Sequence, residues 1–136
     1  MKDSLRDNRG GMIATNKSAL IAVVDDDASV RESLPELLRT FGFAATPFVS
    51  AEAFLQSAEL GDTRCLISDV MMPSMSGPQL QQEVNRRKLD IPIIFITGRR
   101  DSTLRKTLLA QGAVECLFKP FRAEEVLLAL KGALSG

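Results

Sequence analysis

The stretch Ala19-Leu20-Ile21-Ala22-Val23-Val24-Asp25-Asp26-Asp27 joins a continuous apolar run of strand length to three consecutive acids. Such a run is typical of a strand buried on both faces of a parallel sheet. Apolar residues at helical spacing follow it, and they alternate with further strand-like runs near residues 44–49, 64–68, 93–96 and 114–118. Five strands alternating with five helices predict an α/β fold, a doubly wound five-stranded parallel sheet with helices on both faces.

The signals at the predicted helix ends agree with this pattern. Gly42 and Gly112 follow the last periodic residues of the first and fourth helices, where glycine commonly ends a helix. Ser76 and Gln79 have the spacing of a capping box, and Pro78 falls in the first turn of the third helix, where its missing N–H is harmless.

Length and composition narrow the possible functions. The 136 residues fit one domain, and 17 basic residues balance 17 acidic ones, so no overall charge favours nucleic acid or a membrane. We expect a disordered tail over residues 1–17 and one domain over 18–136. The polar start and the absence of an apolar stretch of membrane length favour a cytoplasmic protein without direct nucleic acid contact. Cys65 and Cys116 lie in apolar runs and are expected to pack in the core.

Polar side chains stand where four predicted strands end. They are Asp25 with Asp26, Asp69, Thr97 and Lys119. In an open parallel sheet, functional groups gather outside the carboxyl ends of the strands. In the flavodoxin-like strand order 2-1-3-4-5, the first and third strands are neighbours, so the acids of both would lie close together and repel one another. Magnesium, which prefers oxygen ligands, is the cation expected to stabilise them.

A carboxylate held near a metal, a lysine and a hydroxyl is a plausible phosphoryl acceptor. The carboxylate attacks as an ionised nucleophile, Lys119 and the metal offset charge on the phosphoryl oxygens, and Thr97 donates a hydrogen bond to one of them. The chain contains no histidine, which removes the commonest general base, but this chemistry needs no protein base.

The segments VVDDD, SDVMMPSMSG, IIFITG and LFKPF resemble, in order and spacing, the receiver domain of two-component response regulators over roughly residues 18–135. VRESLPELL and ITGRRD resemble the FixJ type more weakly. The resemblance implies that Asp69 is the phosphoacceptor and that Asp25 and Asp26 are the acidic magnesium pair. It further implies that the backbone carbonyl of Met71 completes the metal shell. Thr97 matches the switch hydroxyl and Lys119 the family's lysine, followed by Pro120 across a bond that is typically cis.

The resemblance also implies partners and an output. A phosphohistidine of a sensor histidine kinase or phosphotransfer protein would supply the phosphoryl group. The switch would act through the face made by the fourth helix, fifth strand and fifth helix, either on a downstream protein or on an output domain missing here, and it allows a phosphorylation-dependent dimer. The chain would be a signalling phosphoacceptor and not an enzyme. Cys116 stands at the position of the family's aromatic switch residue, where a thiol cannot act as a large lever.

Two other functions stay open. Asp25-x-Asp27 resembles the DxD motif of haloacid-dehalogenase-type phosphohydrolases, although that alternative leaves Asp69 unexplained. A degenerate receiver-like module that binds partners without turnover is the second.

Structural roles compete for individual residues. The three acids alone could form a solvated helix start. We expect Met71, Met72 and Met75 to pack in their loop, and Arg99, Arg100, Arg105 and Lys106 to form an ordinary solvated helix face.

Overall fold

Five strands pair in parallel in the order β2-β1-β3-β4-β5, which confirms the predicted sheet. The structure is a computed structural model that describes residues 19–135. The predicted tail over residues 1–17 therefore lies outside the described residues. The strands are β1 (Leu20–Val24), β2 (Ala44–Phe48), β3 (Thr63–Asp69), β4 (Ile93–Thr97) and β5 (Glu115–Phe118).

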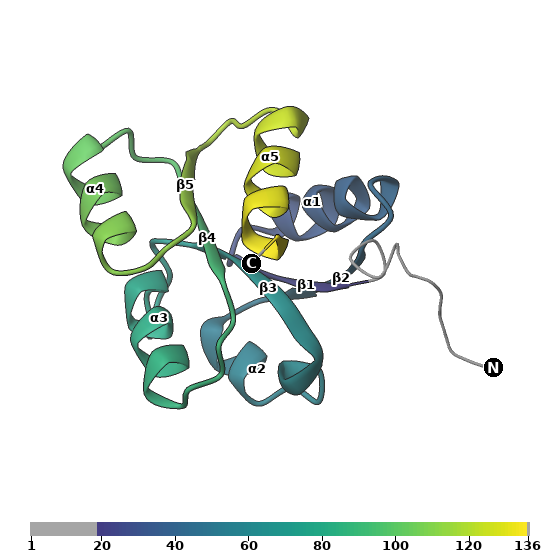
Figure 1. Cartoon of the computed structure of the whole chain (residues 1–136), viewed down its shortest axis with the longest axis horizontal. Helices are drawn as coiled ribbons and strands as arrows, with labels where there is room; N and C mark the ends of the chain where they lie inside the picture. The colour runs from purple at the N-terminus through teal and green to yellow at the C-terminus, as the bar shows by residue number, and fades with distance from the viewer. Residues whose placement is uncertain (1–18, 136) are drawn as a thin grey trace.

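Helices cover both faces of this sheet (Figure 1). One face carries α2, α3 and α4, and the other carries α1 and α5. A short 3-10 helix, η3 (Leu60–Asp62), leads into β3. The α-helices are α1 (Ala28–Thr40), α2 (Ala51–Leu55), α3 (Gly77–Arg86), α4 (Ser102–Ala110) and α5 (Ala123–Leu134).

The apolar run of β1 is buried on both sides because it occupies an inner position of the sheet. Ala22 and Val24 pack toward α2 and α3, whereas Ile21 and Val23 pack toward α1 and α5. This alternation follows from the two-residue period of a strand. An apolar strand with two covered faces leaves its carboxyl end as the place where polar chemistry reaches solvent.

Side chains fix the starts of α1, α3 and α4 next to that end. Asp27 caps α1 by accepting the Ser29 N–H, and Asp101 caps α4. The predicted capping box of Ser76 and Gln79 opens α3. These caps satisfy backbone N–H groups that the first turn of a helix leaves free. The loops after β1, β3 and β4 are therefore held at defined positions.

Candidate functional site

The predicted site residues meet at the carboxyl edge of the sheet. Asp25 directly follows β1, and Asp69 and Thr97 end β3 and β4. Val24 is in register with Ser68, and Thr97 is in register with Phe118, the last residue of β5. Parallel pairing thus brings four strand ends to one edge, as the sequence predicted.

Three carboxylates form a compact acidic cluster there. One oxygen from each of Asp25, Asp26 and Asp69 lies within 4.8 Å of the others. Asp25 is fully buried and Asp69 is nearly so, while Asp26 is exposed. An all-oxygen donor set that is open to water on one side suits Mg²⁺, which binds through one or two carboxylates and keeps several waters. The residues present therefore fit the expected metal.

Lys119 supplies the positive charge beside this cluster. Its Nζ lies 3.0 Å from Asp25 Oδ2 and 3.7 Å from Asp69 Oδ2. Burial disfavours the charged lysine, but the hydrogen bond that Lys119 donates to Asp25 and the charge of Asp69 outweigh it and raise the pKa of Lys119. Lys119 is therefore a cation that already faces both carboxylates.

Burial sets the protonation of Asp69. It raises the pKa of the Asp69 carboxyl from 3.8 to about 6, and the negative charge of Asp25 acts in the same direction. Lys119 opposes the rise, as does a hydrogen bond from the backbone of Met71. At neutral pH most molecules still carry an ionised Asp69, which is the form able to act as a nucleophile.

Thr97 is buried beside the cluster, and its Oγ1 accepts the Arg99 N–H at 3.1 Å. The backbone N–H of Lys119 donates to the Thr97 carbonyl at 2.8 Å, which joins the two strand ends. The expected cis bond before Pro120 is present.

Met71 is 55% exposed, so the expectation that it packs in its loop was wrong. The other two methionines behave as expected. Met72 and Met75 pack against the core on the α2, α3 and α4 side of the sheet. Their neighbour at position 71 is exposed in the loop that follows β3 and Val70.

Cys116 is buried in β5, as predicted, and burial raises the pKa of its thiol. The expectation of a solvated arginine face on α4 was wrong for Arg105. Its Nη2 lies 2.5 Å from Glu115 Oε1, and its Nε donates to the Cys116 carbonyl at 3.4 Å. Arg100 lies over the ring of Phe118, with its guanidinium carbon 5.4 Å from the ring centroid. Side chains of α4 and its leading loop are therefore tied to β5.

Sequence reasoning also missed Arg31. Its Nη1 donates to the backbone carbonyl of Asp25 at 3.0 Å, six residues earlier in the chain. A signal was present, since α1 carries a base where the start of a helix prefers an acid.

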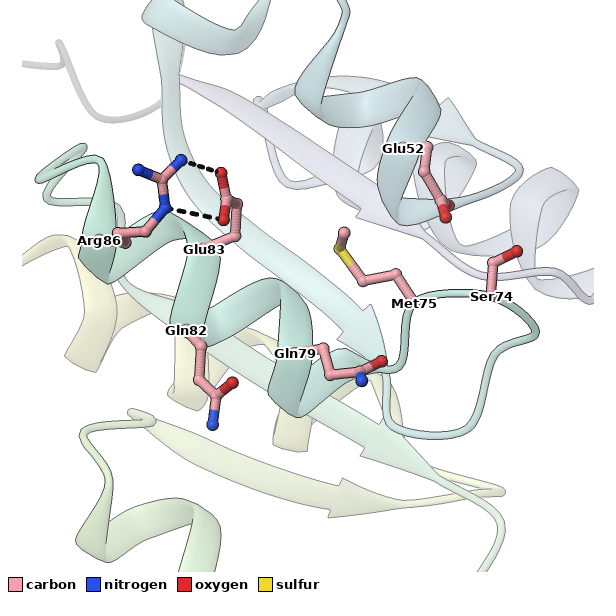
Figure 2. Close-up of a pocket in the computed structure, with 7 residues that line it drawn as sticks. All are labelled: Glu52, Ser74, Met75, Gln79, Gln82, Glu83 and Arg86. Carbon is pink, nitrogen blue, oxygen red and sulfur yellow. Dashed lines mark hydrogen bonds and ion pairs between the residues drawn. The ribbon is translucent and has the colours of Figure 1, made fainter.

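A polar hollow of about 390 Å³ lies between α2 and α3 (Figure 2). The Glu83–Arg86 ion pair, 2.6 Å long, bounds one side of it. Its lining includes none of the acids of the cluster and not Lys119. The chemistry of the strand ends is therefore separate from this hollow. The lining residues are Glu52, Ser74, Met75, Gln79, Gln82, Glu83 and Arg86.

Comparison with known proteins agrees with this geometry. A sequence model of the response regulator receiver domain matches residues 21–131. The chain belongs to this family. Receiver domains of response regulators are signalling proteins of two-component systems, so the family match supports a signalling role over the dehalogenase alternative. The geometry agrees, because Asp27 of the apparent DxD motif is exposed and caps α1, while Asp69 lies in the cluster.

Several full regulators contain a similar receiver domain. Nodulation protein W of Bradyrhizobium diazoefficiens is 42% identical over 125 residues, which cover 92% of this chain and 55% of that protein. The response regulator TodT of Pseudomonas putida is 39% identical over 120 residues, 88% of this chain and 53% of TodT. FixJ of Azorhizobium caulinodans is 38% identical over 118 residues, 87% of this chain and 56% of FixJ. This receiver domain thus spans about half the length of the curated relatives it matches.

Solved structures show the same fold. The crystal structure of FixJ-N has a TM-score of 0.77 at 37% identity and covers 87% of this chain and 94% of that one. The response regulator StyR has a TM-score of 0.78 at 40% identity, covering 85% of this chain and 59% of StyR. None of the helices within residues 19–135 has the length and apolar character of a membrane span.

Proposed function

We propose that this receiver domain accepts a phosphoryl group on Asp69 in a magnesium-dependent reaction and switches partner binding through the α4-β5-α5 face. The observation that carries the proposal is the convergence of the three carboxylates with Lys119 at the ends of β1, β3 and β5. A solvated helix start would explain Asp26 and Asp27 but not a half-buried lysine that contacts two carboxylates.

Each residue has a part in the transfer. An oxygen of ionised Asp69 attacks phosphorus, the bond from phosphorus to the donor histidine nitrogen breaks, and that nitrogen leaves with the electron pair. Asp25 and Asp26 would hold Mg²⁺ together with Asp69 and the Met71 carbonyl, and the bound ion supplies positive charge that offsets the phosphoryl oxygens. Lys119 adds its own charge.

Thr97 is the residue proposed to read the phosphoryl group. Its hydroxyl oxygen now accepts from the Arg99 N–H, and its proton is available to donate to a phosphoryl oxygen. A move of Thr97 toward Asp69 breaks the bond to Arg99, two residues before the cap of α4 at Asp101. This route transmits the signal through the loop and α4, because Cys116 is too small to act as a lever.

The donor and the output follow from the same proposal. A phosphohistidine of a sensor kinase or phosphotransfer protein would feed Asp69. Because the curated relatives are about twice as long as the match, we infer that an output domain or a separate protein receives the signal, and a dimer through α4-β5-α5 is one form the output can take. Light scattering with and without a phosphodonor tests dimer formation.

Intact mass after incubation with Mg²⁺ and a small acyl-phosphate donor tests the transfer itself. We expect one added phosphoryl group, lost in Asp69→Asn and without metal, but kept in Asp62→Asn, which alters an exposed aspartate before β3. No addition despite Mg²⁺ binding would favour the degenerate binding module. Addition that survives Asp69→Asn but not Asp25→Asn would favour the dehalogenase-type reaction.

A further inference from the structure

Arg31 reaches backward from α1 to the turn that carries the acids. It is the fourth residue of the helix, and its backbone N–H donates to the Asp27 carbonyl at 3.1 Å. Its half-buried side chain runs toward the helix N-terminus, where Nη1 donates to the Asp25 carbonyl at 3.0 Å. Helical side chains lean in this direction, so the reach needs no unusual backbone.

The position of this cation is unfavourable for the helix alone. A helix N-terminus carries partial positive charge and prefers acids in its first turn. Within the described residues, the first turn of α1 contains no acid, and Arg31 comes directly after Val30 in the helix. The negative charge of Asp25, Asp26 and Asp27 offsets this cost, so the acidic turn stabilises the Arg31 cation and the helix dipole does not.

Arg31 binds Asp25 without using a carboxylate oxygen. The Asp25 N–H donates to the Phe48 carbonyl at 3.2 Å, and Oδ1 accepts the Asp27 N–H at 2.9 Å. Oδ2 accepts Lys119 Nζ at 3.0 Å. A cation on this carboxylate competes with Lys119, but it does not compete with Arg31, which holds the backbone. Arg31 can therefore fix the turn equally well with and without a metal.

We propose that Arg31 is a positioning residue for the cation site. It anchors the turn after β1 so that the carboxylates of Asp25 and Asp26 face Asp69, and its charge reduces the repulsion within the cluster. This inference rests on the proposed metal-dependent function and adds to it a residue outside the expected ligand set. Groups that orient metal ligands typically change metal affinity by about 10-fold or more when they are removed.

A magnesium titration followed by backbone amide NMR tests the proposal, and the full chain is used. The chain contains no tryptophan or tyrosine whose fluorescence could report Mg²⁺ binding. The backbone amides of residues 25–27 are therefore the direct probe. Arg31→Met removes the donor and keeps the apolar stem. Arg39→Met is the matched control, because Arg39 also lies in α1 and donates from Nη2 to a backbone carbonyl, that of Ala45, at 2.8 Å. Urea unfolding without metal compares the stability of both variants.

We expect Arg31→Met to weaken Mg²⁺ binding about 10-fold, Arg39→Met to bind like wild type, and Arg31→Lys to recover most of the loss because it keeps a charged donor. Equal Mg²⁺ affinity in wild type and Arg31→Met would overturn the proposed role of Arg31 and leave the proposed metal site standing. An equal loss in the two methionine variants also overturns it, since it would reflect general destabilisation of α1. Wild type that binds no Mg²⁺ would instead contradict the proposed metal site, and this inference with it.

Discussion

Replacing Gly77 with alanine should destabilise the domain, because Gly77 lies against the end of the strand that carries Asp69. An alanine Cβ would stand 2.5 Å from the Asp69 carbonyl oxygen and 2.8 Å from a ring carbon of Phe95. Such contacts are essentially never closer than 3.0 Å, so the gap must open by at least 3.0 − 2.5 = 0.5 Å. The oxygen belongs to the backbone and cannot rotate away, and the Gly77 N–H is bonded to the Val70 carbonyl.

The magnitude follows from two opposing effects. Overpacking of this kind costs about 3 kcal/mol, at the upper end of the usual range. The alanine recovers up to about 1 kcal/mol by restricting the unfolded chain. We therefore expect a net loss of about 2 kcal/mol in the free energy of unfolding, which for a domain of this size lowers Tm by roughly 8 °C.

Urea unfolding followed by far-UV circular dichroism measures this loss. Gly61→Ala is the control, because a Cβ at Gly61 meets nothing within 4 Å, and it should be neutral or slightly stabilising. Gly77→Ala as stable as Gly61→Ala would refute the close approach of α3 to β3. The same variant should also phosphorylate more slowly, since any relief of the contact moves the backbone of Asp69.

Three further substitutions test the charged residues Asp69, Lys119 and Glu115. Burial, and then a neighbouring carboxylate, raise the pKa of Asp69 to about 6, so the folded protein becomes less stable as pH rises from about 4 to 6. Asp69→Asn should therefore be about 1 kcal/mol more stable than wild type at pH 7, because solvent screens part of the penalty, and it should lose this advantage at pH 4. Lys119→Met leaves buried carboxylates unpaired and should cost about 2 kcal/mol at pH 7, a loss that shrinks in acid in urea titrations; no recovery in acid would contradict the pairing. Glu115→Gln breaks the ion pair with Arg105, which is worth up to about 1 kcal/mol, and should speed hydrogen exchange in α4 by up to about 5-fold. Glu83→Gln breaks a comparable pair within α3 and should leave hydrogen exchange in α4 unchanged.

The sequence was sufficient to predict the sheet and the acidic cluster for a simple reason. Apolar runs set the strands, and parallel pairing then forces their carboxyl ends onto one edge, so residues as distant as Asp25 and Lys119 meet without any further information. Capping by Ser76 with Gln79 was equally readable, because it depends on residues three positions apart.

Other contacts depend on how elements pack, which spacing does not record. Arg105 pairs with Glu115 only because α4 turns that side toward β5, and the sequence is equally compatible with a solvated arginine. Gly77 reads as an ordinary turn residue in its sequence, and only the approach of α3 to Asp69 shows why it has no side chain. The hydrogen bond from Arg31 to the Asp25 carbonyl forms only when the Arg31 side chain and the folded acidic turn bring the two groups together.

The contacts at Cys116 have a consequence for the outer strands of the sheet. β5 has a neighbour on one side only, yet the Cys116 N–H donates to Glu115 Oε1 at 2.9 Å and its carbonyl accepts from Arg105. Two side chains thus occupy the edge N–H and carbonyl of Cys116, two groups to which a sixth strand would bond. At the opposite edge, β2 contains Pro47, which has no N–H to offer. Both edges are therefore blunted against strand addition, a protection that exposed sheet edges need against aggregation.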